Sequence, residues 1–175
     1  MSNIQELWMN ENYLNGTIPT EIGELRALKD LRLQNTHMSG ELPDELFNLK
    51  LIERINLYDA NFTGTISTLI GKLSPTLSML RLRGNNFYGE LPTEMNLLTT
   101  LQSFWVHFTS IAGAVPSGLC RLRDDLILRE LVADCMPNED SGVAQIECPD
   151  GCCTACCDDV TGLCFDMLNR SSNGN

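Results

Sequence analysis

The residues best suited to chemistry are eight cysteines, all of which lie between residues 120 and 164. They are Cys120, Cys135, Cys148, Cys152, Cys153, Cys156, Cys157 and Cys164. An even number of cysteines in a short acidic segment is typical of disulfides formed in an oxidising compartment. We therefore predict that all eight form disulfides, and the sequence alone assigns no connectivity.

A zinc site is the main alternative for this segment. Cys153 and Cys156 have the spacing of a zinc knuckle, and Cys148 or Cys164 could supply further ligands. A second C-x-x-C pair and a nearby histidine are both missing, so we favour disulfides and predict no metal. A redox role for the Cys153–Cys156 pair is disfavoured because the usual strand–helix context is absent.

Catalytic groups are scarce elsewhere. The chain has two histidines, His37 and His107, and neither lies in a recognisable nucleophile or metal motif. No phosphate-binding loop, dinucleotide fingerprint or kinase signature is present. We predict a protein without catalytic residues or cofactors, and so not an enzyme.

Charge and hydropathy exclude two classes of protein. The 175 residues carry a net charge of −11, and residues 120–175 contain 4 basic against 11 acidic residues. A nucleic-acid-binding protein would show the opposite sign over a broad face. No apolar run is long enough to span a membrane, and the first residues, MSNIQELWMNEN, do not read as a signal peptide.

An internal repeat determines the architecture. The first copy reads Ile4-x-x-Leu7-x-Met9-x-x-Asn12-x-Leu14-x-Gly16-x-Ile18-Pro19-x-x-Ile22-Gly23-x-Leu25. Further copies begin at Leu28, Ile52, Leu77 and Leu101, with one extra residue near Ser74-Pro75, and a short sixth strand spans residues 128–133. Five copies in register indicate a solenoid in which neighbouring coils bury each other's apolar side.

This frame resembles the plant-type leucine-rich repeat over residues 4–133. The resemblance implies an α/β-type solenoid, a right-handed superhelix with a parallel sheet on its concave face and short 3-10 or irregular segments on its convex face. We expect residues 1–133 to form the repeat array and residues 134–175 a cysteine-rich acidic cap. In this family an Asn after the strand bonds to adjacent coils, and only Asn12 and Asn85 keep it here.

The array also lacks the N-terminal cap that family members usually carry. An open first coil would leave apolar surface and a strand edge in solvent. We expect further coils and a targeting segment upstream, which would reconcile the cysteines with the missing signal peptide.

The outward positions of the strands form three columns on the concave face. The first is Glu6, Asp30, Arg54, Met79 and Ser103; the second is Trp8, Arg32, Asn56, Arg81 and Trp105; the third is Asn10, Gln34, Tyr58, Arg83 and His107, with Phe108 beyond. Arginine beside tryptophan and tyrosine is typical of binding hot spots. The predicted ligand-binding residues are Arg32, Arg54, Tyr58, Arg81, Arg83, Trp105, His107 and Phe108. The alternative is an ordinary solvated ladder, with Arg54 and Asp30 as a cross-strand ion pair.

Three sequons, at Asn15, Asn61 and Asn169, are predicted glycosylation sites compatible with secretion. The resemblance then implies a monomeric, extracellular or cell-surface recognition module that binds a protein, a peptide or a carbohydrate. A wall-associated spacer glycoprotein and an intracellular repeat scaffold with a zinc-bound tail are the alternatives.

Overall fold

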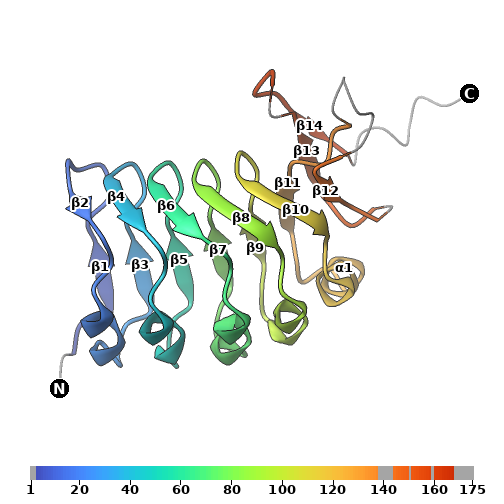
Figure 1. Cartoon of the computed structure of the whole chain (residues 1–175). Coiled ribbons are helices and arrows are strands. Elements are labelled where there is room, and N and C mark those ends of the chain that lie inside the picture. The colour runs from blue at the N-terminus through green and yellow to red at the C-terminus, as the bar shows by residue number, and fades with distance from the viewer. Residues whose placement is uncertain (1–2, 138–143, 150, 159, 168–175) are drawn as a thin grey trace, which may run out of the picture.

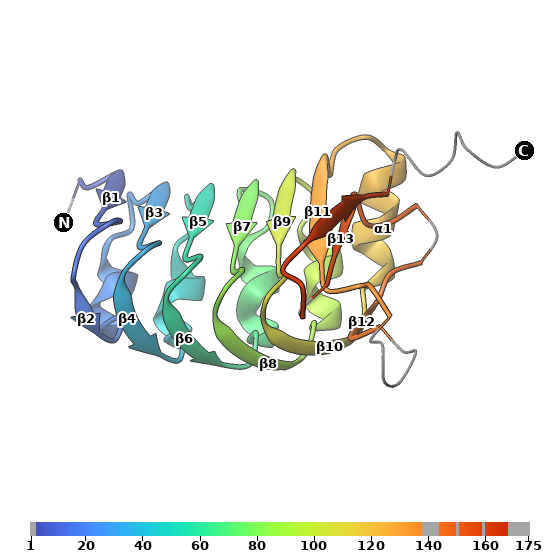
Figure 2. The ribbon, with the colours of Figure 1, turned by 90° about the horizontal axis from the view of Figure 1, so that it is seen from above.

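The computed structural model describes residues 3–137, 144–149, 151–158 and 160–167. Over these residues the chain winds into a solenoid with two sheets along its opposite long sides (Figures 1 and 2). One coil follows another from the N-terminal to the C-terminal end, as the repeat predicted. The predicted solenoid is confirmed.

The sheet that carries the candidate site has eight strands. In spatial order they are β1 (Glu6–Trp8), β3 (Asp30–Arg32), β5 (Arg54–Asn56), β7 (Met79–Arg81), β9 (Ser103–Trp105), β11 (Glu130–Ala133), β13 (Ala155–Cys157) and β14 (Cys164–Asp166). All neighbouring pairs are parallel except β13 and β14, which are antiparallel. We call the outward face of this sheet the concave face.

A second, six-stranded sheet lies on the opposite side and was not expected. Its strands are β2 (Asn15–Gly16), β4 (His37–Gly40), β6 (Asn61–Gly64), β8 (Asn86–Glu90), β10 (Ser110–Ala114) and β12 (Ile146–Glu147). Each repeat offers one inward apolar residue here, so the sequence shows no alternation from which a strand could be predicted. The repeated glycine turns the chain, with φ of +81° at Gly40 and +85° at Gly64, in the left-handed region.

Short 3-10 helices connect the two sheets along the lower edge in Figure 1. They are η1 (Thr20–Glu24), η2 (Asp44–Asn48), η3 (Thr68–Leu73) and η4 (Thr93–Leu97), and the fifth coil has the α-helix α1 (Ser117–Asp124) instead. Each of the first four follows the frame's proline except η3, where Ser67 stands in its place. The Ser67 hydroxyl accepts a hydrogen bond from the Leu69 amide at 3.2 Å, which replaces the proline by a side-chain cap.

The core is a continuous apolar column between the sheets. Inward positions such as Leu31, Leu57 and Leu80 are at most 2% exposed. Phe62 and Phe87, from consecutive coils, stack with ring centroids 6.5 Å apart. Stacking of neighbouring coils therefore supplies the burial that no single coil could obtain.

Asn85 is the residue that most clearly joins two coils through the predicted asparagine position. Its Nδ2 donates to Leu57 O at 2.8 Å and Leu82 O at 2.9 Å, and its Oδ1 accepts from Phe62 N at 3.0 Å. Asn12, by contrast, bonds only within its own coil, to Met9 O and Asn10 O. The interruption predicted for this ladder is thus observed.

The cap continues the solenoid. Strand β13 pairs with β11, and β12 pairs with β10, so both sheets extend past residue 133. Asp134 accepts hydrogen bonds from the Phe108 and Thr109 amides, and Gln145 Nε2 donates to Thr109 O. The cap thereby takes over, for the last full coil, the bonds that an asparagine would provide. The predicted boundary at residues 133/134 stays a prediction.

An apolar pocket of about 250 Å³ lies at the first described coil, lined among others by Leu7, Met9, Ile18 and Ile22. Within the described ranges, no helix has the length and apolar character needed to cross a membrane.

We predict that Asn85→Ala destabilises the protein by about 2–3 kcal/mol, because it leaves buried backbone groups of two coils without partners. Urea unfolding followed by circular dichroism measures the change. The matched control is Asn12→Ala, which occupies the same repeat position on an exposed coil and should cost less than about 1 kcal/mol. Equal losses of unfolding free energy in the two variants would show that the hydrogen bonds of Asn85 between coils add no stability beyond those within one coil.

Candidate functional site

The strand register brings the predicted columns together on the concave face. Arg32 pairs in register with Asn56, Asn56 with Arg81, and Arg81 with Trp105. Adjacent strands lie about 4.8 Å apart, so these side chains are direct neighbours. The register also adds a member to the first column, because Glu130 of β11 lies beside Ser103.

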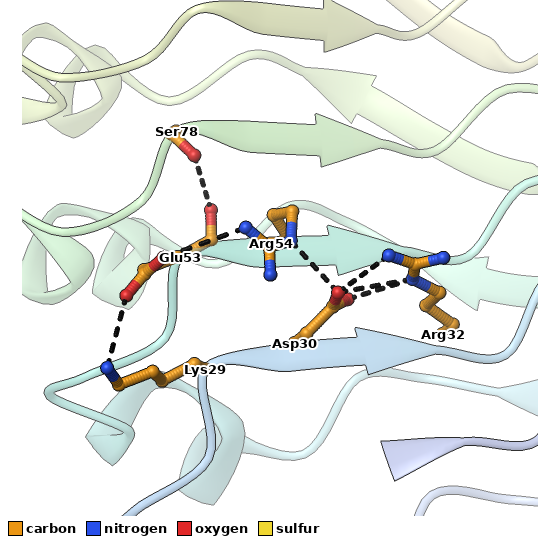
Figure 3. A network of polar contacts seen from close by, with 6 residues as sticks. All are labelled: Lys29, Asp30, Arg32, Glu53, Arg54 and Ser78. Carbon is orange, nitrogen blue, oxygen red and sulfur yellow. Dashed lines mark hydrogen bonds and ion pairs between the residues drawn. The ribbon is translucent and has the colours of Figure 1, made fainter. Parts of the chain in front are cut away.

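Asp30 organises the N-terminal part of the face (Figure 3). Its side chain is fully buried, and its carboxylate accepts from Arg32 Nη2 at 2.8 Å and Arg54 Nε at 2.9 Å. Burial alone would raise the pKa of Asp30, but the hydrogen bonds from the two arginines outweigh it and lower the pKa. Arg32 also lies over the Trp8 ring, 4.3 Å from its centroid. Arg32 and Arg54 are therefore held in an internal network.

Glu130 organises the C-terminal part. One of its carboxylate oxygens accepts from Ser103 Oγ at 2.7 Å, Trp105 Nε1 at 3.1 Å and Arg81 Nη2 at 3.5 Å. The Arg81 guanidinium stacks on the Trp105 ring, 3.9 Å from its centroid. A pocket of about 180 Å³ opens beside this cluster and includes Met79 in its lining.

A third stack lies between these two groups. Arg83 lies over the Tyr58 ring at 5.1 Å and donates to the Asp59 carboxylate. His107 lies beyond it, with its ring 4.9 Å from the Phe108 ring in an edge-on arrangement. The Trp105 ring is 6.1 Å from that of His107. Trp105, His107 and Phe108 therefore form a row of neighbouring rings that begins at the Glu130 cluster.

The four arginines are not the free cations that the sequence suggested. Asp30 pairs with two of them, Glu130 with Arg81 and Asp59 with Arg83. The sequence pointed to one of these carboxylates, Asp30, as an ion-pair partner of Arg54, and the structure contains that pair. Asp59 lies in the turn after a strand, and Glu130 lies on the sixth strand at the position that continues the first column after Ser103.

Five polar atoms on this face are buried and have no hydrogen-bond partner among the described residues. They are Gln34 Oε1, Asn56 Oδ1, Arg81 Nε, Arg83 Nε and His107 Nδ1. Gln34 and Asn56 belong to the predicted columns but not to the predicted ligand-binding residues. A buried polar atom without a partner costs free energy, so this cluster is unusual for a surface with a purely structural role.

The turn residue after each concave strand has a left-handed backbone conformation, and in the fifth coil this residue is Phe108. Its φ is +57°, in a region that bulky side chains disfavour, and the equivalent residues Glu11, Asn35, Asp59 and Gly84 have φ between +52° and +64°. The Phe108 amide is held there by the Asp134 carboxylate at 2.9 Å. This conformation presents an aromatic ring next to His107 at some cost in backbone energy.

The eight cysteines form four disulfides, as predicted. The pairs are Cys120–Cys152, Cys135–Cys156, Cys148–Cys153 and Cys157–Cys164. Cys153 and Cys156 belong to different pairs, so the zinc knuckle considered as the alternative does not form in this state. Cys120 of α1 is joined to the cap, which ties the last coil to it covalently.

Two of the three predicted glycosylation sites lie among the described residues. Asn15 on β2 and Asn61 on β6 are both exposed, on the sheet opposite the concave face. Asn169 lies outside the described residues. Their modification stays a prediction.

Comparisons with known proteins agree with the fold. The Leucine Rich Repeat family profile matches residues 3–25 and 27–49. A search of curated protein sequences gives no match. Among solved structures, the chain is similar to a TDR receptor, with 27% identity, a TM-score of 0.69 and coverage of 75% of this chain and 22% of the receptor.

Two further structures extend this comparison. The Arabidopsis thaliana receptor kinase HAESA, solved with the peptide hormone IDA and the co-receptor SERK1, has 27% identity and a TM-score of 0.67 over 74% of this chain and 21% of HAESA. A plant ice-binding protein has 28% identity and a TM-score of 0.65 over 75% of this chain and 40% of that protein. The chain thus spans less than half the length of each of these three proteins.

We predict that His107 makes the protein less stable in mild acid. Burial, and then the nearby Arg83 guanidinium, lower the pKa of His107 from 6.5 to about 4. The unfolded chain therefore binds a proton more readily than the folded one, and stability falls as the pH drops from 6.5 towards 4, by up to about 1.4 kcal/mol per pH unit. Urea unfolding at several pH values, compared between the wild type and His107→Gln, measures this slope.

The variant His37→Gln serves as the control, because it removes the exposed histidine and should keep the wild-type slope. It also leaves one histidine, so NMR titration of the remaining imidazole reads the His107 pKa directly. A pKa near 6.5 for this signal would contradict the prediction.

Proposed function

From the leucine-rich-repeat fold of this chain and its similarity to plant receptor ectodomains, we propose that it is a recognition module that binds a ligand on its concave face. The ligand is a protein or peptide, with a carbohydrate as the second class. Tyr58, Arg81, Arg83, Trp105 and His107 contact it in this proposal. Phe108 borders the same surface, and Arg32 and Arg54 hold the face in shape through Asp30.

The cluster of unpartnered polar atoms is the observation that carries the proposal. Two of them, Gln34 Oε1 and Asn56 Oδ1, are acceptors on the second and third coils, and two, Arg81 Nε and Arg83 Nε, are donors on the fourth. Each such atom costs about 1–3 kcal/mol when left unsatisfied in a buried position. These atoms are almost fully shielded from solvent, so a ligand that offers donors and acceptors along its length recovers this free energy once side chains of the face shift to expose them. A peptide backbone and a sugar ring both do so.

The pairing of the arginines narrows the chemistry further. Because Arg81 and Arg83 already have carboxylate partners, the face does not attract anions by a large positive potential. Instead, the Arg81 guanidinium lies 3.9 Å from the centroid of the Trp105 ring and that of Arg83 lies 5.1 Å from the centroid of the Tyr58 ring, which holds these side chains in place for a ligand to pack against. This favours recognition by shape and hydrogen bonding.

An extracellular or cell-surface location and a monomeric state are part of the proposal. Four disulfides favour an oxidising compartment over the intracellular scaffold with a zinc-bound tail. A spacer glycoprotein would need no unpartnered polar atoms on its concave face. Binding, rather than catalysis, is therefore the activity that we assign.

We predict that replacing Arg81 by Gln together with Trp105 by Ala lowers ligand affinity by at least about 20-fold, since stacked arginine and tryptophan residues dominate interface energies. The immobilised wild type is tested against a pool of extracellular peptides and a panel of wall oligosaccharides, and calorimetry then measures the affinity of both proteins for each hit.

The matched control replaces Arg26 by Gln and Tyr88 by Ala, an exposed arginine and an exposed tyrosine away from the concave face. This variant should bind like the wild type. If it loses binding while the concave variant keeps it, the ligand site lies elsewhere. If no peptide or sugar binds the wild type, the spacer becomes the better account.

Intact mass spectrometry of the protein from a secreting host tests the proposed location. We expect no cysteine to react with iodoacetamide before reduction, because all eight are paired. Eight should react after reduction in denaturant, and glycosidase treatment should remove mass from Asn15 or Asn61. Free reaction of the thiols in the native protein would favour the intracellular scaffold.

A further inference from the structure

Reactive side chains also gather at the C-terminal end of the concave face, beyond the arginine–aromatic stacks. A ring nitrogen of His107 and the sulfurs of Cys157 and Cys164 lie within 4.8 Å of one another. The two cysteines are joined by a disulfide and lie directly opposite each other on β13 and β14, with Cα atoms 3.9 Å apart. His107 comes from the fifth coil, so this corner joins the repeats to the cap.

The β13–β14 hairpin has backbone bonds of its own that hold the two sulfurs opposite each other. The Asp158 amide donates to Leu163 O, and the Gly162 amide donates to Asp158 O, both at 2.9 Å. At the other end of the hairpin, Met167 N donates to Thr154 O at 3.0 Å. The pairing of the strands therefore does not depend on the disulfide alone, and the cysteines stay neighbours when that bond is broken.

This disulfide is also the most accessible of the four. Cys164 is exposed, whereas no cysteine of the other three pairs is exposed. Thiol–disulfide exchange requires a thiolate to reach a sulfur atom. A reductant should therefore reach the Cys157–Cys164 bond first.

We propose that reduction of Cys157–Cys164 turns this corner into a binding site for a thiophilic divalent cation, zinc above all, held by the two thiolates and His107. His107 is only 5% exposed, and its Nδ1 has no hydrogen-bond partner in the described part of the chain. Two thiolates and one imidazole form a zinc ligand set with a fourth position for water.

The reaction balances with a dithiol as reductant. A dithiol thiolate attacks Cys164 Sγ, forms a mixed disulfide and expels the Cys157 thiolate. The second thiol of the reductant then attacks its own sulfur in the mixed disulfide and expels the Cys164 thiolate. Two electrons and two protons pass to the protein, and the dithiol becomes a cyclic disulfide. Binding of Zn²⁺ by the two thiols releases two protons.

Metal binding would act on the concave face through His107. Its ring borders Trp105 and Phe108, both assigned here to the ligand-binding surface. A ring fixed by a cation could not move to accommodate a ligand. The site itself does not depend on the proposed recognition function, and its test needs no ligand of that face.

The test uses the full chain and Co²⁺ as a spectroscopic probe. The protein is treated with a limiting amount of dithiothreitol and passed through a desalting column. Alkylation and peptide mapping of an aliquot should find thiols at residues 157 and 164 only. The rest, titrated anaerobically with Co²⁺, should bind one equivalent with thiolate-to-cobalt charge-transfer bands and the intense visible bands of tetrahedral cobalt, and Zn²⁺ should displace it. The unreduced protein should show neither set of bands.

Histidine variants identify the third ligand. In reduced His107→Gln, the affinity for Co²⁺ should fall by more than about tenfold, whereas reduced His37→Gln, the matched control, should bind like the wild type. Circular dichroism checks that both variants fold. Should His107→Gln fail to fold, His37→Gln still provides a test, because its single imidazole NMR signal must shift when Zn²⁺ is added to the reduced protein and must not shift in the oxidised protein.

Three results would overturn the proposal. The first is the absence of stoichiometric cobalt binding after selective reduction. The second is equal binding by a folded His107→Gln variant or an unmoved imidazole signal. The third is reduction of another disulfide before Cys157–Cys164, which would show that the Cys157–Cys164 bond is not the one most accessible to a reductant.

Discussion

Every other feature of this protein depends on the fact that one coil cannot bury its own apolar side. The inward residues of a coil, such as Leu31 and Leu57, leave water only when the next coil stacks on them. A shift of the strand register by one residue would expose these leucine side chains to solvent, so the stacking of coils fixes the register. The outward columns of the concave face follow from that register, which makes their side chains neighbours.

The repeat frame predicted the columns of the concave face, but it did not predict strands without an apolar alternation or contacts that depend on side-chain direction. The 24-residue period was sufficient to place Arg81 next to Trp105 and Asn56, because every coil obeys the same frame. The second sheet was not predicted, because one apolar residue per coil does not give the alternation of apolar and polar residues that indicates a strand. Asp59 was not predicted as a partner because it lies in a turn, where a frame of strand positions does not give the side-chain direction, whereas Glu130 follows from that frame when the first column is continued into the sixth strand. The cysteine-rich cap was predicted from its composition, whereas its strands were not, since they continue the sheets without repeating the motif.

The concave face shows how a repeat scaffold can hold polar groups ready for recognition. Asp30 and Glu130 each gather several donors, and both are set by strand register rather than by loops. Arginines fixed in this way lose little conformational freedom when a ligand arrives. The cost is that Gln34 and Asn56 remain buried with an acceptor unsatisfied, and the stability of the stacked coils is what allows the fold to tolerate it.

The reversed direction of β14 also governs how the array can grow. A solenoid of parallel strands is self-templating, because its last strand offers the next coil the same hydrogen-bonding edge that it used itself. The antiparallel pairing of β14 with β13 reverses the last described strand of this sheet, so a coil that runs in the direction of β13 could add here only as an antiparallel neighbour. The hairpin thus removes the parallel template from this edge of the eight-stranded sheet, and the Cys157–Cys164 bond joins its two strands.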